Sequence, residues 1–348
     1  MRYPSILFGF AIAVVGVNCS RDDHQIATVE PGAQLAHTQS GPAPLKPNAA
    51  GYQHVPGGVL VHQDCIHQVP NGATVDASGN VSAGGQVVAT YPACTHPMCF
   101  RGQDQSPCLG SDPPAAGGWV DWSTAPAINI DGLSEFNELD SGTFQVPAPP
   151  LYSLDGQLIY MFPSLESIVS SEIVQPVLQW GQYCNGSECI GSYYTWTYAA
   201  WAVTSTGAFY SSGISVSESD VLDGQIILTS SLHNTFFWTI TAKDTTTGQQ
   251  TSLNAAILAA ALNIANSGVL EAYSINSCND FPDQSWTYFG APTLVAQAGP
   301  GVTNYNQVTP TWTACSFPPA SGCGPSGYSG PSCNFGASIY QGGVTVNY

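Results

Sequence analysis

Short runs of β-branched and aromatic residues, separated by Gly, Pro, Asn and Ser, recur along the chain from about Trp119 to Ala298. Runs of this length and spacing are typical of the strands of an antiparallel β-sandwich or barrel. The pattern therefore predicts an all-β domain over residues 119–298. We predict strands within residues 142–146, 157–162, 174–179, 193–203, 208–217, 225–229 and 236–241.

One stretch inside this domain departs from the pattern. Residues 252–266 contain Leu253-Asn-Ala-Ala-Ile-Leu-Ala-Ala-Ala-Leu, whose Ala- and Leu-rich sequence favours a helix. In an otherwise β context, the same residues can instead form a loop beside a strand.

The regions on either side of this domain differ from it in composition. Residues 20–50 are polar and without sustained periodicity, which predicts a flexible segment. Residues 51–118 contain the strand-like Val59–His62 and Gln86–Thr90, turn sequences and a final Pro- and Gly-rich linker, so we predict a small disulfide-stapled β unit. Residues 299–348 form a predicted C-terminal extension rich in Cys, Gly and Pro, with a disulfide-pinned loop at its centre.

The N-terminus has the features of an export signal. Arg2 precedes an uncharged stretch from Tyr3 through Val17 that is dominated by apolar residues, so we predict a signal peptide at residues 1–19. This stretch is too short to span a bilayer comfortably, and no later window reaches the roughly 18 to 20 apolar residues of a membrane-spanning helix. We expect a secreted, extracellular protein, with lipid attachment at Cys19 as the alternative if the source is bacterial.

Ten cysteines follow Cys19, an even number that suits disulfide bonds in an oxidising compartment. Cys184 and Cys189 flank the turn sequence Asn-Gly-Ser-Glu, so we predict a local bond between them. The sequence leaves the other pairings open.

The chain is strongly acidic, with a formal net charge of −18. Of its five Lys and Arg residues only Lys243 lies after residue 118, against sixteen Asp and Glu residues from Asp121 to Asp283. Such a surface repels nucleic acid, which we exclude as a partner. Repulsion between carboxylates falls as they are protonated, so the composition suits an acidic medium, although it also suits a role in solubility alone.

Several short motifs follow one another along the main domain. The motifs are Trp119-Val-Asp-Trp122, Asp140-Ser-Gly-Thr-Phe-Gln-Val-Pro-Ala-Pro149, Val177-Leu-Gln-Trp-Gly181, Tyr193-Tyr-Thr-Trp196-Thr-Tyr-Ala-Ala-Trp201, Ile214-Ser-Val-Ser-Glu-Ser-Asp220, Phe237-Trp-Thr-Ile-Thr-Ala-Lys-Asp-Thr-Thr-Thr-Gly-Gln249 and Leu270-Glu-Ala-Tyr273. In this order and spacing, over about residues 119–294, they resemble the eqolisin-type glutamic peptidases, which are secreted acid proteases. The chain departs from the family at Tyr160-Met-Phe-Pro-Ser-Leu165, where the family has a Trp-containing segment, and at Ala272, where the family has an aromatic residue.

The resemblance implies a concanavalin A-like (jelly-roll) sandwich of two antiparallel sheets and an acid endopeptidase that cleaves polypeptide substrates without a cofactor. It implies that Gln179 is the catalytic Gln and Glu271 the catalytic Glu. A carboxylate on a largely buried sheet face can act as general base towards water and return the proton to the leaving amine. A neighbouring amide can donate a hydrogen bond to the developing oxyanion, and removal of one such donor costs about 2.7–4 kcal/mol of barrier.

Aromatic residues are dense between residues 183 and 210. Strand alternation places Tyr194, Trp196 and Tyr198 on one face, so we take them as candidate substrate-binding residues, with packing in a β core as the alternative. Aromatic rings also stack on sugars. A noncatalytic sandwich that binds polysaccharide through the Trp196 strand, and an extracellular structural protein without activity, are therefore the alternatives to the peptidase.

Six of the seven histidines precede residue 100. Cys65-Ile-His67 and Cys94-Thr-His96-Pro-Met-Cys99 resemble zinc-binding sequences, but an oxidising compartment favours disulfides, so we expect no metal. If residues 51–118 cover the acidic sandwich as a pro-region, protonation of these histidines at about pH 6 would alter the contact and could govern release.

Other enzyme classes are not indicated. The sequence has no Gly-x-Ser-x-Gly nucleophile elbow and no Gly-rich loop between a strand and a helix, and only His233 lies in the main domain. We expect a monomer that needs no cofactor.

Overall fold

The computed structural model divides the chain into two units, residues 1–40 and 41–348, and only the second contains residues whose structure is described. The predicted signal peptide and most of the predicted flexible segment therefore lie outside the described residues. The described residues are 44–110, 117–127, 135–151, 156–170, 172–185, 188–233, 235–258, 262–297 and 305–348.

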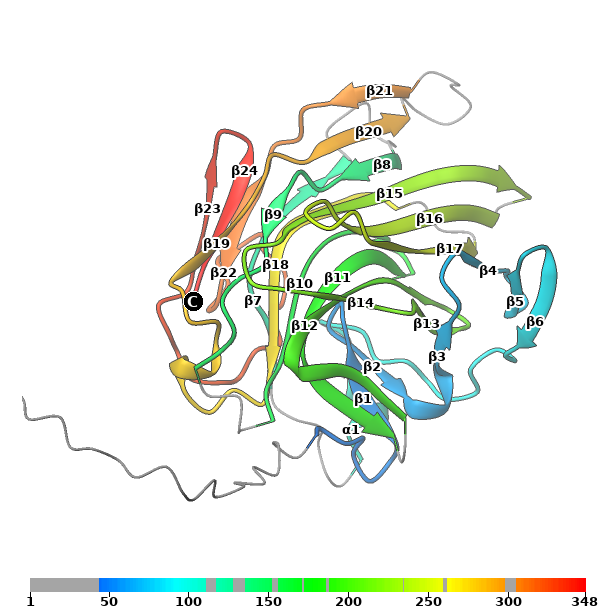
Figure 1. Cartoon of the computed structure of the whole chain (residues 1–348), viewed down its shortest axis with the longest axis horizontal. Coiled ribbons are helices and arrows are strands. Elements are labelled where there is room, and N and C mark those ends of the chain that lie inside the picture. The colour runs from blue at the N-terminus through cyan, green and yellow to red at the C-terminus, as the bar shows by residue number, and fades with distance from the viewer. Residues whose placement is uncertain are drawn as a thin grey trace, which may run out of the picture. The chain divides into compact units, whose positions relative to one another are not determined.

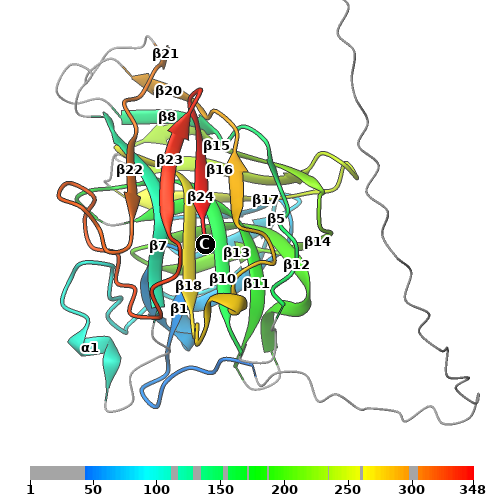
Figure 2. The same ribbon diagram turned by 90° about the vertical axis from the view of Figure 1, so that its left-hand side faces the viewer.

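Two β-sheets pack face to face (Figures 1 and 2). Within the described residues, the first sheet has nine strands, in the order β22-β7-β18-β10-β11-β12-β13-β3, with β14 paired to β12. These strands are β3 (Ile66–Val69), β7 (Gly117–Pro126), β10 (Leu158–Glu166), β11 (Ile173–Asn185), β12 (Glu188–Thr204), β13 (Gly207–Ser211), β14 (Ile214–Val216), β18 (Ile264–Tyr273) and β22 (Thr313–Ser316).

The second sheet has thirteen strands in the described part of the chain, and ten of them follow the order β23-β24-β19-β9-β15-β16-β17-β4-β5-β6. The other three form a branch in which β8 pairs with β15, β20 with β8 and β21 with β20. The strands of this sheet are β4 (Ala73–Val75), β5 (Asn80–Ala83), β6 (Gln86–Thr90), β8 (Glu135–Asp140), β9 (Phe144–Gln145), β15 (Val221–Leu232), β16 (Thr235–Asp244), β17 (Gln250–Leu258), β19 (Trp286–Phe289), β20 (Thr293–Gln297), β21 (Tyr305–Val308), β23 (Gly336–Tyr340) and β24 (Gly343–Asn347).

A separate two-stranded hairpin lies before both sheets in the sequence, and helical structure within the described ranges is limited to short turns. The hairpin pairs β1 (Tyr52–Val55) with β2 (Val59–His62). The short turns are η1 (Gln63–Cys65), α1 (Ser106–Leu109) and η3 (Cys278–Asp280), and no helix among the described residues is long and apolar enough to cross a membrane.

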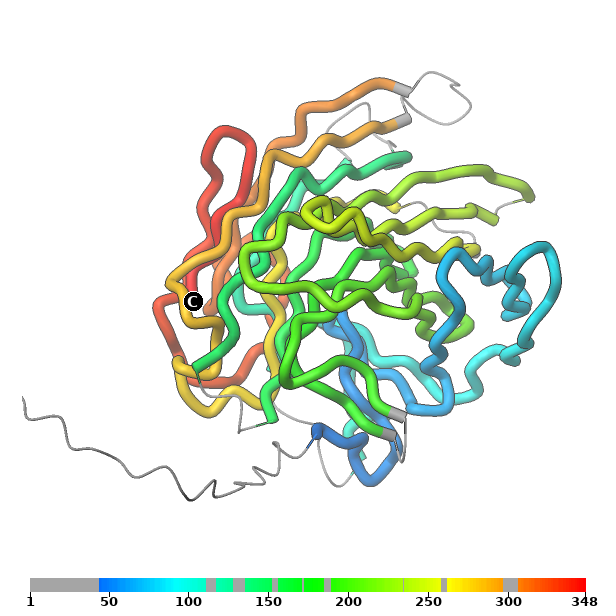
Figure 3. The backbone as a smooth tube through the Cα atoms, viewed as in Figure 1, coloured from blue at the N-terminus to red at the C-terminus, as the bar shows by residue number. Residues whose placement is uncertain are grey.

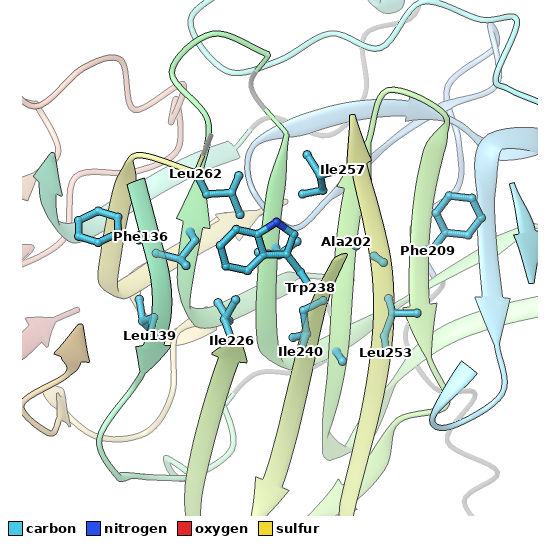
Figure 4. Packing of buried hydrophobic residues seen from close by; sticks show 14 of the residues in the cluster. Phe136, Leu139, Ala202, Phe209, Ile226, Trp238, Ile240, Leu253, Ile257 and Leu262 are labelled. Carbon is cyan, nitrogen blue, oxygen red and sulfur yellow. The ribbon is translucent and has the colours of Figure 1, made fainter. Parts of the chain in front are cut away.

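The main core lies between the two sheets. One buried cluster places Trp238 and Ile240 of β16 and Ile226 of β15 against Ala202 of β12 and Phe209 of β13 (Figure 4). Alternate residues of each strand point into this layer, as the period of two in the sequence requires. The predicted all-β sandwich is confirmed.

The predicted helix at residues 252–266 is wrong, because residues 252–258 lie in β17 and residues 264–266 lie in β18. Leu253, Ala255 and Ile257 of β17 alternate into the core between the sheets. Pairing of β17 with β16 satisfies their backbone hydrogen bonds, so tertiary packing overrides the helix propensity of Ala and Leu.

The regions before and after the main domain add strands to both sheets. Residues 44–110, which we call the N-terminal segment, place β3 beside β13 and β4 beside β17, each in parallel. Figure 3 shows this segment, blue to cyan, reaching the edge of the second sheet where β4, β5 and β6 lie. The C-terminal extension pairs β22 with β7 and β24 with β19. The domain boundaries at residues 118 and 298 stay predictions.

All ten cysteines after Cys19 are paired, and the predicted Cys184–Cys189 bond is confirmed. The bonds fall into two groups, two inside the N-terminal segment and three inside residues 117–348, and none of the five joins the groups. Five disulfides are typical of extracellular proteins. The other four bonds are Cys65–Cys94, Cys99–Cys108, Cys278–Cys333 and Cys315–Cys323.

Candidate active site

The sheet register brings Gln179 and Glu271 onto one surface. Tyr160 of β10 is paired with Gln179 of β11 on one side and with Glu271 of β18 on the other. Residues directly opposite in neighbouring strands point to the same face of a sheet. The three side chains therefore form a row, with Tyr160 in the middle and the Cα atoms of Gln179 and Glu271 about 10 Å apart.

This row lies on the outer face of the first sheet, the face turned away from the second sheet. Tyr160 and Val177 belong to a buried cluster on that face, whereas their neighbours Met161 and Leu178 belong to the core between the sheets. The row is thus separate from the main core, and its burial depends on what covers the outer face.

Glu271 is fully buried and its carboxylate has three hydrogen-bond donors. The backbone N–H groups of Gly57 and Gly58 donate to Oε2 and Oε1 at 2.8 and 3.0 Å, and the Tyr273 hydroxyl donates to Oε1. Burial raises the pKa of Glu271 to about 7, against the opposing effect of these donors and of the Arg101 charge. The carboxyl group is therefore neutral at acidic pH in this arrangement.

The cover over Glu271 is the β1–β2 hairpin, which we call the cap hairpin, with its tip at residues 56–58. Gly57 and Gly58 have φ values of 104° and 72°, which glycine adopts without strain, and this turn aims both N–H groups at the carboxylate. Behind the tip, Gln175 Nε2 donates to the Pro56 carbonyl at 2.7 Å. The His54 ring stacks on Tyr273 with centroids 3.9 Å apart.

Arg101 anchors a second part of the N-terminal segment to the same face. Its guanidinium carbon lies 3.7 Å from the centroid of the Trp119 ring, and its Nη2 lies 3.7 Å from Oε2 of Glu166. Nη1 also donates to the Pro325 carbonyl at 2.7 Å. One cation thus contacts β7, β10 and the C-terminal extension together.

Gln179 occupies a different environment at the other end of the row. Its amide nitrogen donates to the carbonyls of Gly181 and Ile190 at 3.1 and 3.2 Å. Gly191 makes room for this arrangement, because a Cβ atom there would lie 2.1 Å from the Gln179 nitrogen.

Gln179 also borders a cavity of about 340 Å³ on the outer face. The cavity is lined by hydroxyls and aromatic rings, a lining suited to a polar, uncharged segment of a ligand. Its walls include Ser192, Thr195, Thr197, Trp201 and Tyr210.

The three aromatic residues that we predicted to bind substrate do not line this cavity. Trp196 and Tyr198 are buried in the core between the sheets, and Tyr194 is 76% exposed at the surface. The opposite alternation of β12 supplies the cavity wall, through Thr195, Thr197 and others. The binding role of Tyr194, Trp196 and Tyr198 stays a prediction.

This chain has structural similarity to solved proteins. Its structural neighbours are glutamic peptidases. Scytalido-glutamic peptidase with a peptide-based transition-state analogue aligns with a TM-score of 0.40 and 12% identity, over 67% of this chain and 99% of that one. The same peptidase with a transition-state analogue inhibitor gives 0.39 and 14%, again over 67% and 99%. SCP-B, a member of the eqolisin family, in a complex with the tripeptide Ala-Ile-His gives 0.37 and 14% over the same shares.

No family model and no curated protein matches the sequence. The solved structures above include a member of the eqolisin family, which is the family that the order of the motifs resembles.

Sequence reasoning missed most of the surroundings of Glu271. Strand alternation alone indicates that Tyr273 shares the face of Glu271, and that Ala272 points into the core. The contacts from Gly57 and Gly58 had no such signal, because more than 200 residues separate them from Glu271 in the sequence.

Proposed function

We propose that this chain is a secreted acid endopeptidase of glutamic type, made in a closed form in which the N-terminal segment covers the active site. Glu271 would act as general base and then general acid, and Gln179 would hold the attacking water and stabilise the oxyanion. The observation that carries the proposal is the row of Gln179, Tyr160 and Glu271 on one face, beside a cavity large enough for a side chain of a peptide.

The cap hairpin accounts for inactivity of the closed form in two ways. It fills the space above Glu271, and it keeps that carboxyl group away from water, which holds its pKa at about 7. A protonated carboxyl group cannot accept a proton from water. Once the hairpin leaves, solvent lowers the pKa of Glu271, so the carboxylate becomes available as a base at modestly acidic pH.

Gln179 and Tyr160 supply the donors that the developing oxyanion requires. Both hydrogens of the Gln179 amide are directed to carbonyl groups in the closed form, so one of these bonds has to be exchanged for the substrate. Burial raises the pKa of Tyr160 well above its ordinary value, with smaller effects from Tyr183 and Glu271. Its phenol therefore stays protonated, and it can donate between the two ends of the row.

The covalent structure supports a removable N-terminal segment. Both of its disulfides, Cys65–Cys94 and Cys99–Cys108, are internal, so a cut in the Pro- and Gly-rich linker at 111–118 would leave no covalent tie to the sandwich. The non-covalent contacts that remain include the pairing of β3 and β4, the cap hairpin, the contacts of Arg101 and the backbone bonds of Leu45 to β11.

Acid weakens one of these remaining contacts. Burial lowers the pKa of His67 on β3 to about 4, against the opposing effect of Asp64, while its ring packs against Tyr91 and Phe209. A lowered pKa means that the folded state favours neutral His67. The stability that this provides is present above about pH 6.5 and is lost as the pH falls towards 4. Attachment of β3 should therefore loosen in an acidic medium.

The test is to insert the recognition sequence of a specific protease into residues 111–116, cut there, acidify and assay digestion of a denatured protein from pH 2 to 7 with a pepsin-type inhibitor present. We expect acid-limited activity only after the cut, and its loss in Glu271→Gln. Glu138→Gln, the same chemical change on the second sheet, should keep it.

Failure would be clear from the same samples. If the cut protein has released the segment, keeps its β-sheet circular dichroism and still cleaves nothing at any pH, the peptidase proposal is wrong. Activity that persists in Glu271→Gln would reject the assigned base while keeping the activity. The carbohydrate-binding alternative gains no support here, because Trp196 and Tyr198 lie inside the core.

A further inference from the structure

Three side chains of the N-terminal segment converge at a point that the proposed activity does not use. They are His62 at the end of β2, Asp64 in η1, and His96 in the loop after β6. One ligand atom from each lies within 4.8 Å of the others. The Cys65–Cys94 bond joins the residue after Asp64 to the residue two before His96, so the covalent structure holds the two chain segments together.

The distances at the core of this cluster suit a transition metal. His62 Nδ1 and Asp64 Oδ2 are 3.5 Å apart. Two ligands at about 2.0–2.2 Å from one zinc ion in tetrahedral geometry are separated by about 3.4 Å. Nδ1 also accepts a hydrogen bond from the Asp64 backbone N–H at 3.3 Å, so this nitrogen carries no proton, and its one lone pair would exchange this hydrogen bond for the metal ion.

The position of His96 requires one adjustment. Its ring is stacked on that of His62, with centroids 3.6 Å apart and an interplanar angle of 12°. A metal ion lies close to the plane of each imidazole that binds it, so one ion cannot lie in both parallel planes. His96 is the ring free to turn, because it is half-buried on a loop, whereas His62 is enclosed by Gly51 and Tyr52.

We propose that His62, Asp64 and His96 form a binding site for a divalent transition-metal ion of the zinc type, with water completing the coordination. Imidazole nitrogens favour Zn²⁺, Cu²⁺ and Ni²⁺ over Ca²⁺ and Mg²⁺, which prefer a shell of oxygen ligands. The ion would tie the end of the cap hairpin to the 91–98 loop, and so it would stabilise the folded N-terminal segment. The cysteines nearby take no part, because both are in disulfides.

The experiment is isothermal titration of the full-length protein with Zn²⁺ at neutral pH, with Mg²⁺ as the comparison ion. We expect one Zn²⁺ ion per chain at this site, no binding of Mg²⁺, and a rise in the thermal unfolding temperature with Zn²⁺. His96→Gln and His62→Asn should each weaken Zn²⁺ binding at least tenfold. Asn at position 62 keeps an acceptor for the Asp64 N–H, which protects the fold of η1.

The matched control is His67→Gln, which removes an imidazole from the same segment but lies outside the cluster, against Tyr91. It should bind Zn²⁺ as the wild type does. The proposal is overturned if the wild type does not bind Zn²⁺, or if His96→Gln binds it with unchanged affinity. If His62→Asn does not fold, the Zn²⁺ affinity of His96→Gln alone decides the test. None of these outcomes depends on peptidase activity.

Discussion

The two ends of the row on the outer face differ in what covers them. At Glu271 the surface is closed, because the cap hairpin supplies two backbone donors and leaves the carboxylate fully buried. At Gln179 the same face opens into a cavity of about 340 Å³. Both ends lie on one sheet, on β11 and β18, and the tip of the cap hairpin contacts only the Glu271 end.

Under the proposed function, this contrast would be the way in which a catalytic surface is stored inactive. The half that would bind the substrate side chains is already formed, while the half that would activate water is occupied by the chain itself. The hairpin satisfies the carboxylate with N–H groups that belong to backbone, so no particular side chain is needed at the tip. What the tip needs is a backbone conformation, which Gly57 and Gly58 provide.

The variant that should most strongly reduce the difference between the closed Glu271 end and the open Gln179 end is Gly57→Val. Valine is strained at a φ of 104°, at a cost of about 1–3 kcal/mol, and its Cβ would lie 3.1 Å from Ile173. Loss of the bond to Glu271 adds about 1.5–3 kcal/mol. We expect closure of the tip to weaken by about 4 kcal/mol, which lowers amide hydrogen-exchange protection at residue 58 by about 1,000-fold.

Gly84→Val is the control for this change. Gly84 also has a positive φ, in the turn between β5 and β6, but a Cβ atom there meets nothing within 4 Å. Exchange at residue 58 should be unchanged in this variant. Equal loss of protection in both variants would mean that strain anywhere in the segment opens the tip, and that the contact with Glu271 is not what closes it.

A second test measures how the stability of the closed Glu271 end depends on pH. The pKa of Glu271 is raised from 4.5 to about 7, so its contribution to stability is fully present below pH 4.5 and is lost as the pH rises through 7. The loss amounts to about 3 kcal/mol. His67 acts in the opposite direction, so the total pH dependence of the wild type combines both groups.

The difference between wild type and Glu271→Gln isolates the first group. From urea unfolding at pH 4.5 and pH 8, we expect the wild type to lose about 3 kcal/mol more than the variant over this range. Glu138→Gln keeps the Glu271 carboxyl and should follow the wild type. Parallel curves for wild type and Glu271→Gln would show that the carboxyl group is not held in a neutral, buried form.

The sandwich was predictable from the sequence because its signal is local. Alternation and turn residues predicted strands where β10, β11, β12 and β16 lie. The same local reasoning failed at β17, since its Ala and Leu residues favour a helix until β16 pairs with them. Helix or strand propensity contributes little free energy per residue, so pairing with a neighbouring strand determines the secondary structure here.

The candidate site was predictable only in part, for a related reason. The motif order singled out Gln179 and Glu271, and the register of β10 explains how they share a face. Alternation puts Trp196 and Tyr198 on the same face of β12, but which face packs against the second sheet depends on the tertiary fold. In the structure this face points into the core between the sheets. The cover over Glu271 depends on contacts between distant parts of the chain, which leave no periodic signal in either part.

The smallest expected effect concerns the second anchor of the cover. Arg101→Gln removes the cation from the Trp119 ring and leaves the partly buried Glu166 without its ion pair. A cation–π contact of this kind is worth up to about 2 kcal/mol when it is shielded from water, so we expect a loss of about 2 kcal/mol in urea unfolding.

Lys46→Gln removes the same charge from an exposed position of the same segment, and should cost less than about 0.5 kcal/mol. If the two variants lose equal stability, Arg101 acts only through net charge, and the cover is held by the cap hairpin and the two parallel strands. A larger loss for Arg101→Gln would instead place a specific contact on the Trp119 side of Glu271, so that both flanks of the closed end are fastened while the Gln179 end stays open.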